Sequence, residues 1–259
     1  MVSTMRGVGA LWWREIIRFL RQRSRVLGAF AQPLLFWVLL GGGFSASFRA
    51  PGAPEDLGSM AYFYPGIIGL VLLFTAIFST IAVVEDRKSG FLQGVLVSPI
   101  SRGSIVLGQA LGGTTLAVLQ GVLFLALAPL VGIELSLRSI VAVVIVIAAI
   151  SFALTSLGLV IAWRMDSTQG FHAIMNLILM PIWLLSGAFF PAAGAAGWLG
   201  WLMKLNPLTY GMAALRRCLY LNAPGAAGHV PALMPSLVIT ALFCGLAFAG
   251  ATAVARRSR

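Results

Sequence analysis

The chain has 259 residues, of which 59% are hydrophobic and 10% are charged, and its net charge is +11. A soluble domain carries about a quarter charged residues, so this composition excludes a soluble globular protein and indicates an integral membrane protein. The basic residues flank apolar stretches instead of clustering with aromatic residues in a polar region, which argues against nucleic-acid binding. The two cysteines, Cys218 and Cys244, suit neither a disulfide framework nor a metal site, and we expect both to be apolar packing residues.

Six apolar stretches are long enough for a helix that crosses a bilayer, which needs about 20 residues. None shows the alternating pattern of a barrel strand, so the predicted fold is an all-α membrane protein. The first stretch follows a basic region too long for a typical signal peptide, and we expect it to be retained. Gly108 and Gly112 have a spacing that lets helices approach closely, although 29 glycines produce such spacings by chance. The six predicted spans are 26–48, 61–84, 104–131, 139–163, 170–190 and 235–255.

The orientation of these spans follows from their basic flanks. Thirteen of the eighteen Lys and Arg residues lie on the side that holds both chain ends. Because basic residues accumulate on the cytoplasmic side of membrane proteins, we expect both termini to be cytoplasmic.

An amphipathic helix is predicted before the first span, over residues 8–25. At about 100° per residue, four arginines share one stripe, and aromatic residues lie on the opposite side. A helix of this kind lies in the headgroup plane of the membrane; the alternative is a basic stop sequence with no further role. The residues that define the two faces are Trp12, Arg14, Arg18, Phe19, Arg21 and Arg25.

The region between the last two spans, residues 191–234, is rich in Gly, Pro and Trp and is divided into pieces too short to span. We expect two short helices that dip into the outer leaflet, at about 195–204 and 207–221. Asn206 and Pro207 are typical of a helix start, as cap and first residue. Arg216 and its neighbour Arg217 would then face the outer headgroups or water.

Sequence signals for catalysis and for cofactor binding are absent. The chain has no phosphate-binding loop of the type G-x-x-x-x-G-K-[ST], and His172 and His229 are isolated. The acids Glu85, Glu134 and Asp166 lie at the ends of predicted spans, so no buried carboxylate suggests a proton relay. We therefore expect neither an enzyme nor a metal or cofactor site in this chain.

The segment between the second and third spans reads VEDRKSGFLQGVLVSPISRG (84–103). Ser89 and Gly90 are expected to end the preceding helix, and Ser98-Pro99 to end a new helix of about two turns. The serine at 101 or the one at 104 is expected to cap the third span. The short helix carries an apolar stripe at helical spacing, formed by Phe91, Leu92, Val95 and Leu96.

Held between two spans, this short helix would act as a lever, because a force on it would tilt both spans together. The alternative is an ordinary polar connector. A connector needs no apolar stripe, since its exposure to water costs about 25 cal/mol per Å².

This segment is similar to the cytoplasmic motif of the ABC-2 type transporter permeases, the membrane subunits of ATP-driven exporters such as the daunorubicin-type and nodulation-factor exporters. Three further features fit: the sequence LSGAFFP at 185–191, NPLTY at 206–210 followed by Arg216, and the amphipathic N-terminal helix. The resemblance spans essentially the whole chain.

The resemblance implies one membrane domain over residues 1–259 that pairs with a second copy or a related permease. It also implies two copies of a separate ABC ATPase, which would hold ATP and Mg²⁺. Helix 87–100 would be the coupling helix and helix 8–25 would lie alongside it, with Glu85 and Asp86 pairing with basic residues of the N-terminal helix or of the ATPase. The implied coupling residues are Glu85, Asp86, Arg87, Gly90, Phe91, Leu92, Val95, Ser98 and Pro99. The implied outer residues are Asn206, Pro207, Tyr210 and Arg216.

The expected function is export across a bacterial cytoplasmic (inner) membrane, driven by ATP that the partner hydrolyses. The apolar residues available to line a pathway favour an amphipathic drug-, lipid- or glycolipid-like cargo. One alternative is a secondary transporter or channel that works without ATP, which would predict internal repeats and buried ionisable residues. Another is a membrane scaffold that recruits cytosolic proteins through the same segment.

Overall fold

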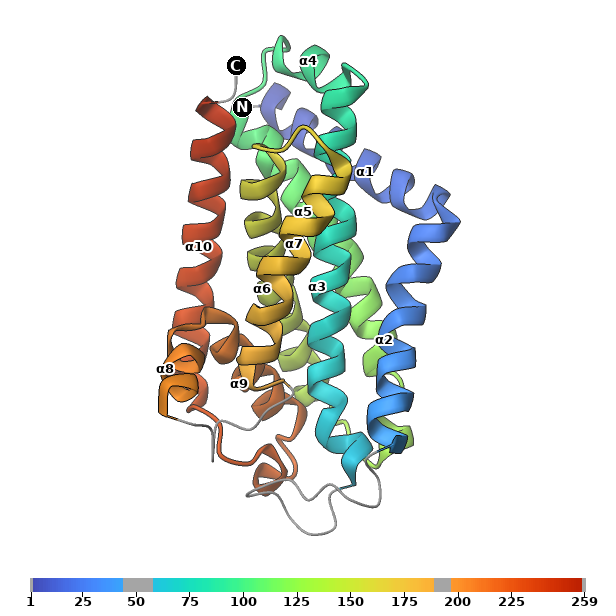
Figure 1. The fold of residues 1–259 in the computed structure, drawn as a ribbon, viewed down its shortest axis with the longest axis vertical. Coiled ribbons are helices and arrows are strands. Elements are labelled where there is room, and N and C mark those ends of the chain that lie inside the picture. The colour runs from blue at the N-terminus through green and yellow to red at the C-terminus, as the bar shows by residue number, and fades with distance from the viewer. Residues whose placement is uncertain (1, 44–57, 189–196, 258–259) are drawn as a thin grey trace.

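The computed structural model describes residues 2–43, 58–188 and 197–257, and within these ranges the chain is helical without a β-strand. Long helices run side by side in an elongated bundle (Figure 1). Helix α1 (Val2–Arg21) crosses one end of the bundle, where α4 (Phe91–Leu96) and both chain ends also lie. Helices α8 (Gly197–Leu205) and α9 (Pro207–Leu219) lie at the opposite end. We refer to these as the α4 end and the α9 end.

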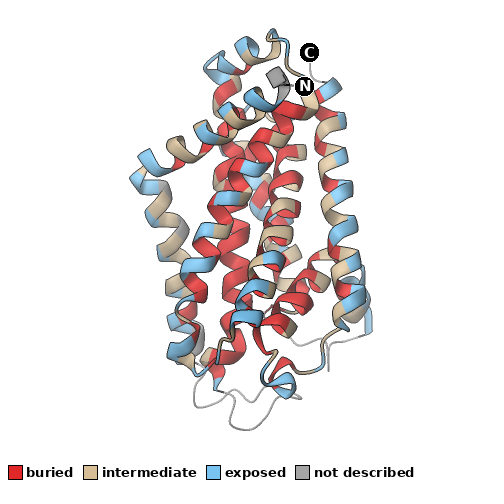
Figure 2. Cartoon of the chain, turned by 180° about the vertical axis from the view of Figure 1, so that it is seen from behind, coloured by how far each residue is buried: buried red, intermediate tan, exposed pale blue. Residues whose placement is uncertain are grey.

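Five helices within the described ranges are long and apolar enough to cross a membrane. Helix α3 is buried along nearly its whole length, whereas α10 exposes much of its surface at the side of the bundle (Figure 2). The five are α3 (Ser59–Lys88), α5 (Arg102–Leu125), α6 (Leu137–Ala162), α7 (Thr168–Trp183) with its extension to Ala188, and α10 (Leu233–Arg257).

The first predicted span, 26–48, corresponds to α2 (Arg23–Gly43). Its apolar part, Val26–Leu39, is shorter than the five helices above. Residues 44–48 lie outside the described part of the chain.

The predicted boundaries of the N-terminal helix, 8–25, are wrong at both ends. Helix α1 begins at Val2, and Gly7 near its start packs against the side chain of Ile100, which precedes α5. It ends at Arg21, and Gln22 separates it from α2, so Arg25 belongs to α2. The side chain of Arg25 lies outside what the structure describes.

Two predicted spans end earlier than expected. The third, predicted as 104–131, ends as α-helix at Leu125 and continues as a 3₁₀ turn that contains Pro129. The fifth, predicted as 170–190, ends as α-helix at Trp183 and passes into a π turn in which Gly187 has φ 76°. Positive φ favours glycine, so the chain leaves the helix there. Residues 189–191 of the LSGAFFP motif lie outside the described ranges.

The pair Gly108 and Gly112 does mark a close helix contact. Helix α1 crosses α5 at these glycines: a Cβ at Gly108 would lie 2.9 Å from Leu11 Cβ, and one at Gly112 would lie 2.7 Å from Glu15 Cβ. The lack of side chains on α5 therefore allows α1 to rest directly on it.

We expect Gly112→Leu to force α1 away from α5 and to lower the free energy of unfolding by about 1–3 kcal/mol, as overpacking does. Denaturant unfolding of the purified chain measures this. The matched control is Gly245→Leu on α10, where an added Cβ meets nothing within 4 Å. Equal unfolding midpoints for the two variants would contradict the contact.

Candidate functional site at the α4 end

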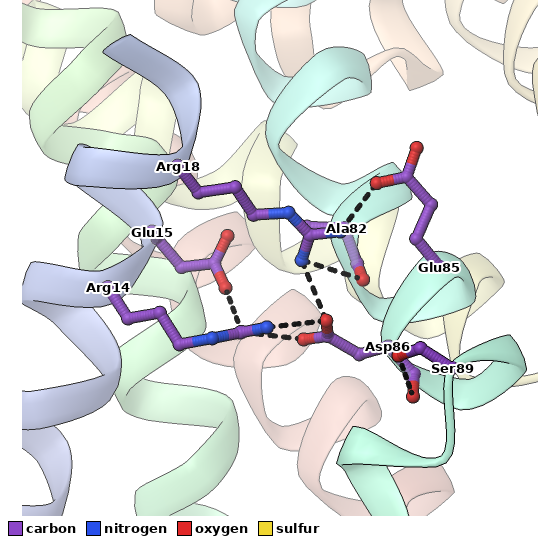
Figure 3. Close-up of polar contacts among 7 residues, drawn as sticks. All are labelled: Arg14, Glu15, Arg18, Ala82, Glu85, Asp86 and Ser89. Atoms are coloured by element: carbon purple, nitrogen blue, oxygen red, sulfur yellow. Dashed lines mark hydrogen bonds and ion pairs between the residues drawn. The ribbon is translucent and has the colours of Figure 1, made fainter. Parts of the chain in front are cut away.

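The carboxylate of Asp86 is the centre of an ion-pair cluster at the α4 end (Figure 3). Asp86 lies in the last turn of α3 and is 3% exposed. Both of its oxygens accept hydrogen bonds from Arg14 of α1, at 2.6 and 2.7 Å, and Oδ1 also accepts one from Arg18 at 2.7 Å. Bidentate, charge-assisted contacts of this kind are among the strongest hydrogen bonds in proteins. The predicted pairing of Asp86 with the N-terminal helix is confirmed.

Two further acids complete this cluster. Arg18 donates to Glu85 Oε2 at 2.5 Å, and Arg14 donates to Glu15 Oε1 at 3.2 Å. The hydrogen bond with Asp86, helped by the nearby negative charges, raises the pKa of the Arg14 guanidinium above its ordinary value against the opposing effect of burial. Arg14 therefore remains charged, and the ion pairs of Arg14 and Arg18 hold α1 on the end of α3.

The short helix α4 follows directly from this cluster. Gly90, with φ 76°, turns the chain out of α3, and α4 then covers only Phe91–Leu96. The guanidinium of Arg14 lies 3.8 Å from the centroid of the Phe91 ring. One arginine side chain thus contacts α3 through Asp86 and α4 through Phe91.

The predicted coupling helix, 87–100, is longer than the helix that forms. At the start of the predicted range, helix α3 continues through Lys88, because its last polar residues form ion pairs and hydrogen bonds. At the other end, Ser98 lies beyond α4 and its hydroxyl donates to Val95 O. After Pro99 the Oγ of Ser101 accepts the backbone N–H of Ser104 at 3.1 Å, which confirms the predicted cap.

The apolar stripe of α4 mainly faces the protein itself. Leu92 is 3% exposed and belongs to the core of the bundle, and Val95 and Leu96 pack partly against that core. Val97 is 87% exposed and Phe91 is 41% exposed. The stripe therefore holds α4 in place, and the apolar surface open to a partner lies at Phe91 and Val97.

Arg87 connects the α4 end to the loop after α6. Its guanidinium donates to the carbonyl oxygens of Trp163 at 2.6 Å and Met165 at 3.1 Å, and to Asp166 Oδ1 at 3.0 Å. Sequence reasoning selected Arg87 but did not find these partners, because two of the three acceptors are backbone groups, which every residue has.

Of the other residues selected in the predicted amphipathic helix, those on one side of α1 contact the rest of the protein. Trp12 Nε1 donates to Thr115 Oγ1 of α5 at 3.0 Å, and Phe19 is buried beside Leu116. Arg21 is exposed. The apolar face of α1 is thus at least partly covered by α5.

The outer residues lie at the α9 end, away from the Asp86 cluster. The side chain of Asn206 accepts the N–H of Leu208 at 3.0 Å and donates to Ile182 O at 2.6 Å, so the predicted cap of α9 is confirmed, with Pro207 as its first residue. Tyr210 donates to Lys204 O at 3.0 Å.

The prediction that Arg216 faces headgroups or water is wrong. Arg216 is 7% exposed, donates to Tyr62 O of α3 at 3.1 Å, and lies 4.6 Å from the centroid of the Tyr62 ring. The ring and the carbonyl replace water around the cation. Arg217 is partly buried and donates to Val230 O and Pro231 O.

No three His, Cys, Asp or Glu side chains come together as a metal site in the ranges that the structure describes. His172 instead lies against aromatic rings, with centroids 6.2 Å from Phe78 and 6.0 Å from Phe171. The contacts described at the α4 end are ion pairs, hydrogen bonds and helix packing.

Residues 6–220 match the sequence profile of the ABC-2 type transporter family. The chain belongs to this family. Relatives of this ABC-2 type transporter include a transport permease named ycf38 from Cyanophora paradoxa, 26% identical over 78% of this chain and 70% of that protein. Nodulation protein J of Sinorhizobium fredii is 27% identical over 86% of each chain, and Nodulation protein J of Neorhizobium galegae is 26% identical over 96% and 92%. With five long apolar helices in the part of the chain that the structure describes, this is a multi-pass membrane protein of a transport family.

We expect Asp86→Asn to be strongly destabilising, because it leaves Arg14 and Arg18 without their shared carboxylate. Loss of one partner of a buried pair costs about 3–5 kcal/mol, and the partial exposure of both arginines places the expected loss near the lower end of this range.

The control for this measurement is Asp166→Asn. Asp166 is 87% exposed in its pair with Arg87, so its removal should cost less than about 1 kcal/mol. Unfolding midpoints of the two variants in the same detergent make the comparison. A loss for Asp86→Asn no larger than that for Asp166→Asn would show that the cluster does not hold α1 on α3.

Proposed function

We propose that this chain is the membrane-spanning permease subunit of an ATP-driven exporter and that the α4 end is where a separate ABC ATPase docks. The observation that carries the proposal is the double contact of Arg14 with Asp86 of α3 and Phe91 of α4. A displacement of α4 by a partner would act on α3 and α1 through this side chain. Family membership and the transport names of its relatives support the assignment.

The proposed topology has six spans, with α2 as the first, and both termini in the cytoplasm of a bacterium. Two observations support it. Most basic residues flank the spans on one side, and both chain ends lie at the same end of the bundle as α4 (Figure 1).

The proposed assembly contains two permease chains, identical or related, and two ATPase subunits that hold ATP and Mg²⁺. The lack of a phosphate-binding loop in this chain supports an external energy source. When ATP closes the ATPase dimer, α4 would be pushed and the helices attached to it would rock. Cargo affinity would differ between the two states, which couples ATP hydrolysis to transport. The cargo class we propose is an amphipathic drug-, lipid- or glycolipid-like molecule.

We expect Val97→Asp to weaken ATPase binding by at least about tenfold, because a charge replaces an exposed apolar side chain of the proposed docking surface. Co-purification of the ATPase with the permease and ATP-dependent export in vesicles measure this. Gln93→Asp is the matched control, since it adds the same charge to an exposed polar position of α4.

Two results would contradict the proposal. One is unchanged ATPase binding and export by the Val97→Asp variant. The other is export by the unaltered chain that persists after ATP is depleted and no ATPase co-purifies, which would identify an ATP-independent transporter or channel.

A further inference from the structure

Helix α3 contains a proline near its α9 end, and this proline leaves a backbone carbonyl without its helical donor. Pro65 has no N–H group, so the carbonyl of Ala61, four residues earlier, cannot form the usual helical hydrogen bond. Ala61 is 5% exposed. An unsatisfied carbonyl in such a buried position is unfavourable, and a neighbouring group has to supply the donor.

The missing donor comes from the end of α9. The hydroxyl of Tyr220 donates to Ala61 O at 2.8 Å, and Tyr220 itself is 5% exposed. One helical turn earlier, Arg216 donates to the next carbonyl of α3, that of Tyr62. Arg216 of α9 and Tyr220, which directly follows α9, therefore hold the first turn of α3.

A cavity of about 530 Å³ reaches this contact. Its lining includes both Ala61 and Tyr220, together with Leu219 of α9, Asn222 and Glu134. Both partners of one hydrogen bond thus border the same open space. If the bond breaks, water in the cavity can satisfy the donor and the acceptor, so release costs less than it would in a closed core.

We propose that Tyr220 and Arg216 form a latch, defined by their hydrogen bonds to Ala61 O and Tyr62 O, which keeps the α9 end closed, and that its release opens this end to cargo. The opening step rests on the proposed function. Helix α3 connects the two ends as one helix, from the latch to Asp86 and Lys88. A shift of α3 driven at α4 therefore reaches the latch, and the carbonyl freed by Pro65 makes the latch breakable without breaking the helix.

Cys218 is a native probe of latch release. It lies on α9, is 4% exposed, and should react with a water-soluble maleimide only when α9 moves out of its packed position in the bundle. The experiment uses the full chain in lipid nanodiscs, where both membrane faces are accessible, with Cys244 changed to Ala so that one thiol remains. We expect Tyr220→Phe to accelerate labelling of Cys218 by about tenfold, the effect of losing a buried hydrogen bond worth about 1.4 kcal/mol.

Tyr210→Phe is the matched control. It removes the same kind of hydroxyl, but from within α9, where the Tyr210 hydroxyl donates to Lys204 O at an exposed position. Its labelling rate should equal that of the parent chain. Equal rates for Tyr220→Phe and Tyr210→Phe would overturn the latch.

A second variant tests the role of Pro65. In Pro65→Ala the new N–H can satisfy Ala61 O within the helix, so the Tyr220 hydroxyl has less to contribute. Tyr220→Phe should then accelerate labelling by less than about threefold in the Pro65→Ala background, against about tenfold in the parent. The same acceleration in both backgrounds would show that Pro65 does not create the latch. A smaller effect of Tyr220→Phe in the Pro65→Ala background cannot arise from misfolding alone, because the same substitution is compared in two backgrounds.

The opening step is tested with the bound ATPase. Labelling of Cys218 should accelerate during ATP turnover, and turnover that leaves the labelling rate unchanged would overturn the gating role. If no ATPase binds the chain, the proposed function fails. The comparison of Tyr220→Phe with Tyr210→Phe in the chain alone still decides whether the latch exists.

Discussion

The burial of the Asp86 carboxylate is the constraint on which the α4 end depends. A carboxylate that is 3% exposed in an apolar bundle is tolerated only if it is paired, and its partners come from α1. Arg14 and Arg18 therefore place α1 across the end of α3. Because Arg14 also covers the Phe91 ring, the same pairing places α4. Three helices that begin far apart in the chain are positioned by one acidic side chain.

Helix α3 transmits this arrangement through the molecule. It is buried along nearly its whole length (Figure 2). Neighbouring helices approach it at small residues. A Cβ at Gly113 of α5 would lie 2.6 Å from Ser79 Oγ, and one at Gly158 of α6 would lie 2.8 Å from Thr80 Oγ1. Close packing of this kind makes α3 move as a unit with its neighbours. Its two ends are held differently, by ion pairs at Asp86 and by side-chain hydrogen bonds to the carbonyl oxygens of Ala61 and Tyr62.

The sequence predicted the local features well because they depend on residues close together in the chain. The break at Gly90, the serine cap before α5 and the start of α9 at Asn206 and Pro207 all follow from backbone preferences of the residues themselves. Helix ends were predicted less well. Near the end of α1 at Arg21, Phe19 is buried beside Leu116 of α5, a contact that no local pattern encodes. Arg216 was misplaced for the same reason: a surface arginine and a buried one have the same flanking residues.

The sequence by itself determined a multi-pass helical protein with a short helix between two spans, because apolar length and turn residues suffice to specify both. The tertiary structure decided which charges pair, which face of α4 is covered and which arginine is buried. Asp86 and Arg14 are 72 positions apart, and Arg216 and Tyr62 are 154 positions apart. Their contacts, and those of Arg87 and Tyr220 with backbone carbonyls, form only where the helices meet. Because every residue has a carbonyl acceptor, the sequence does not indicate which carbonyl accepts the hydrogen bond.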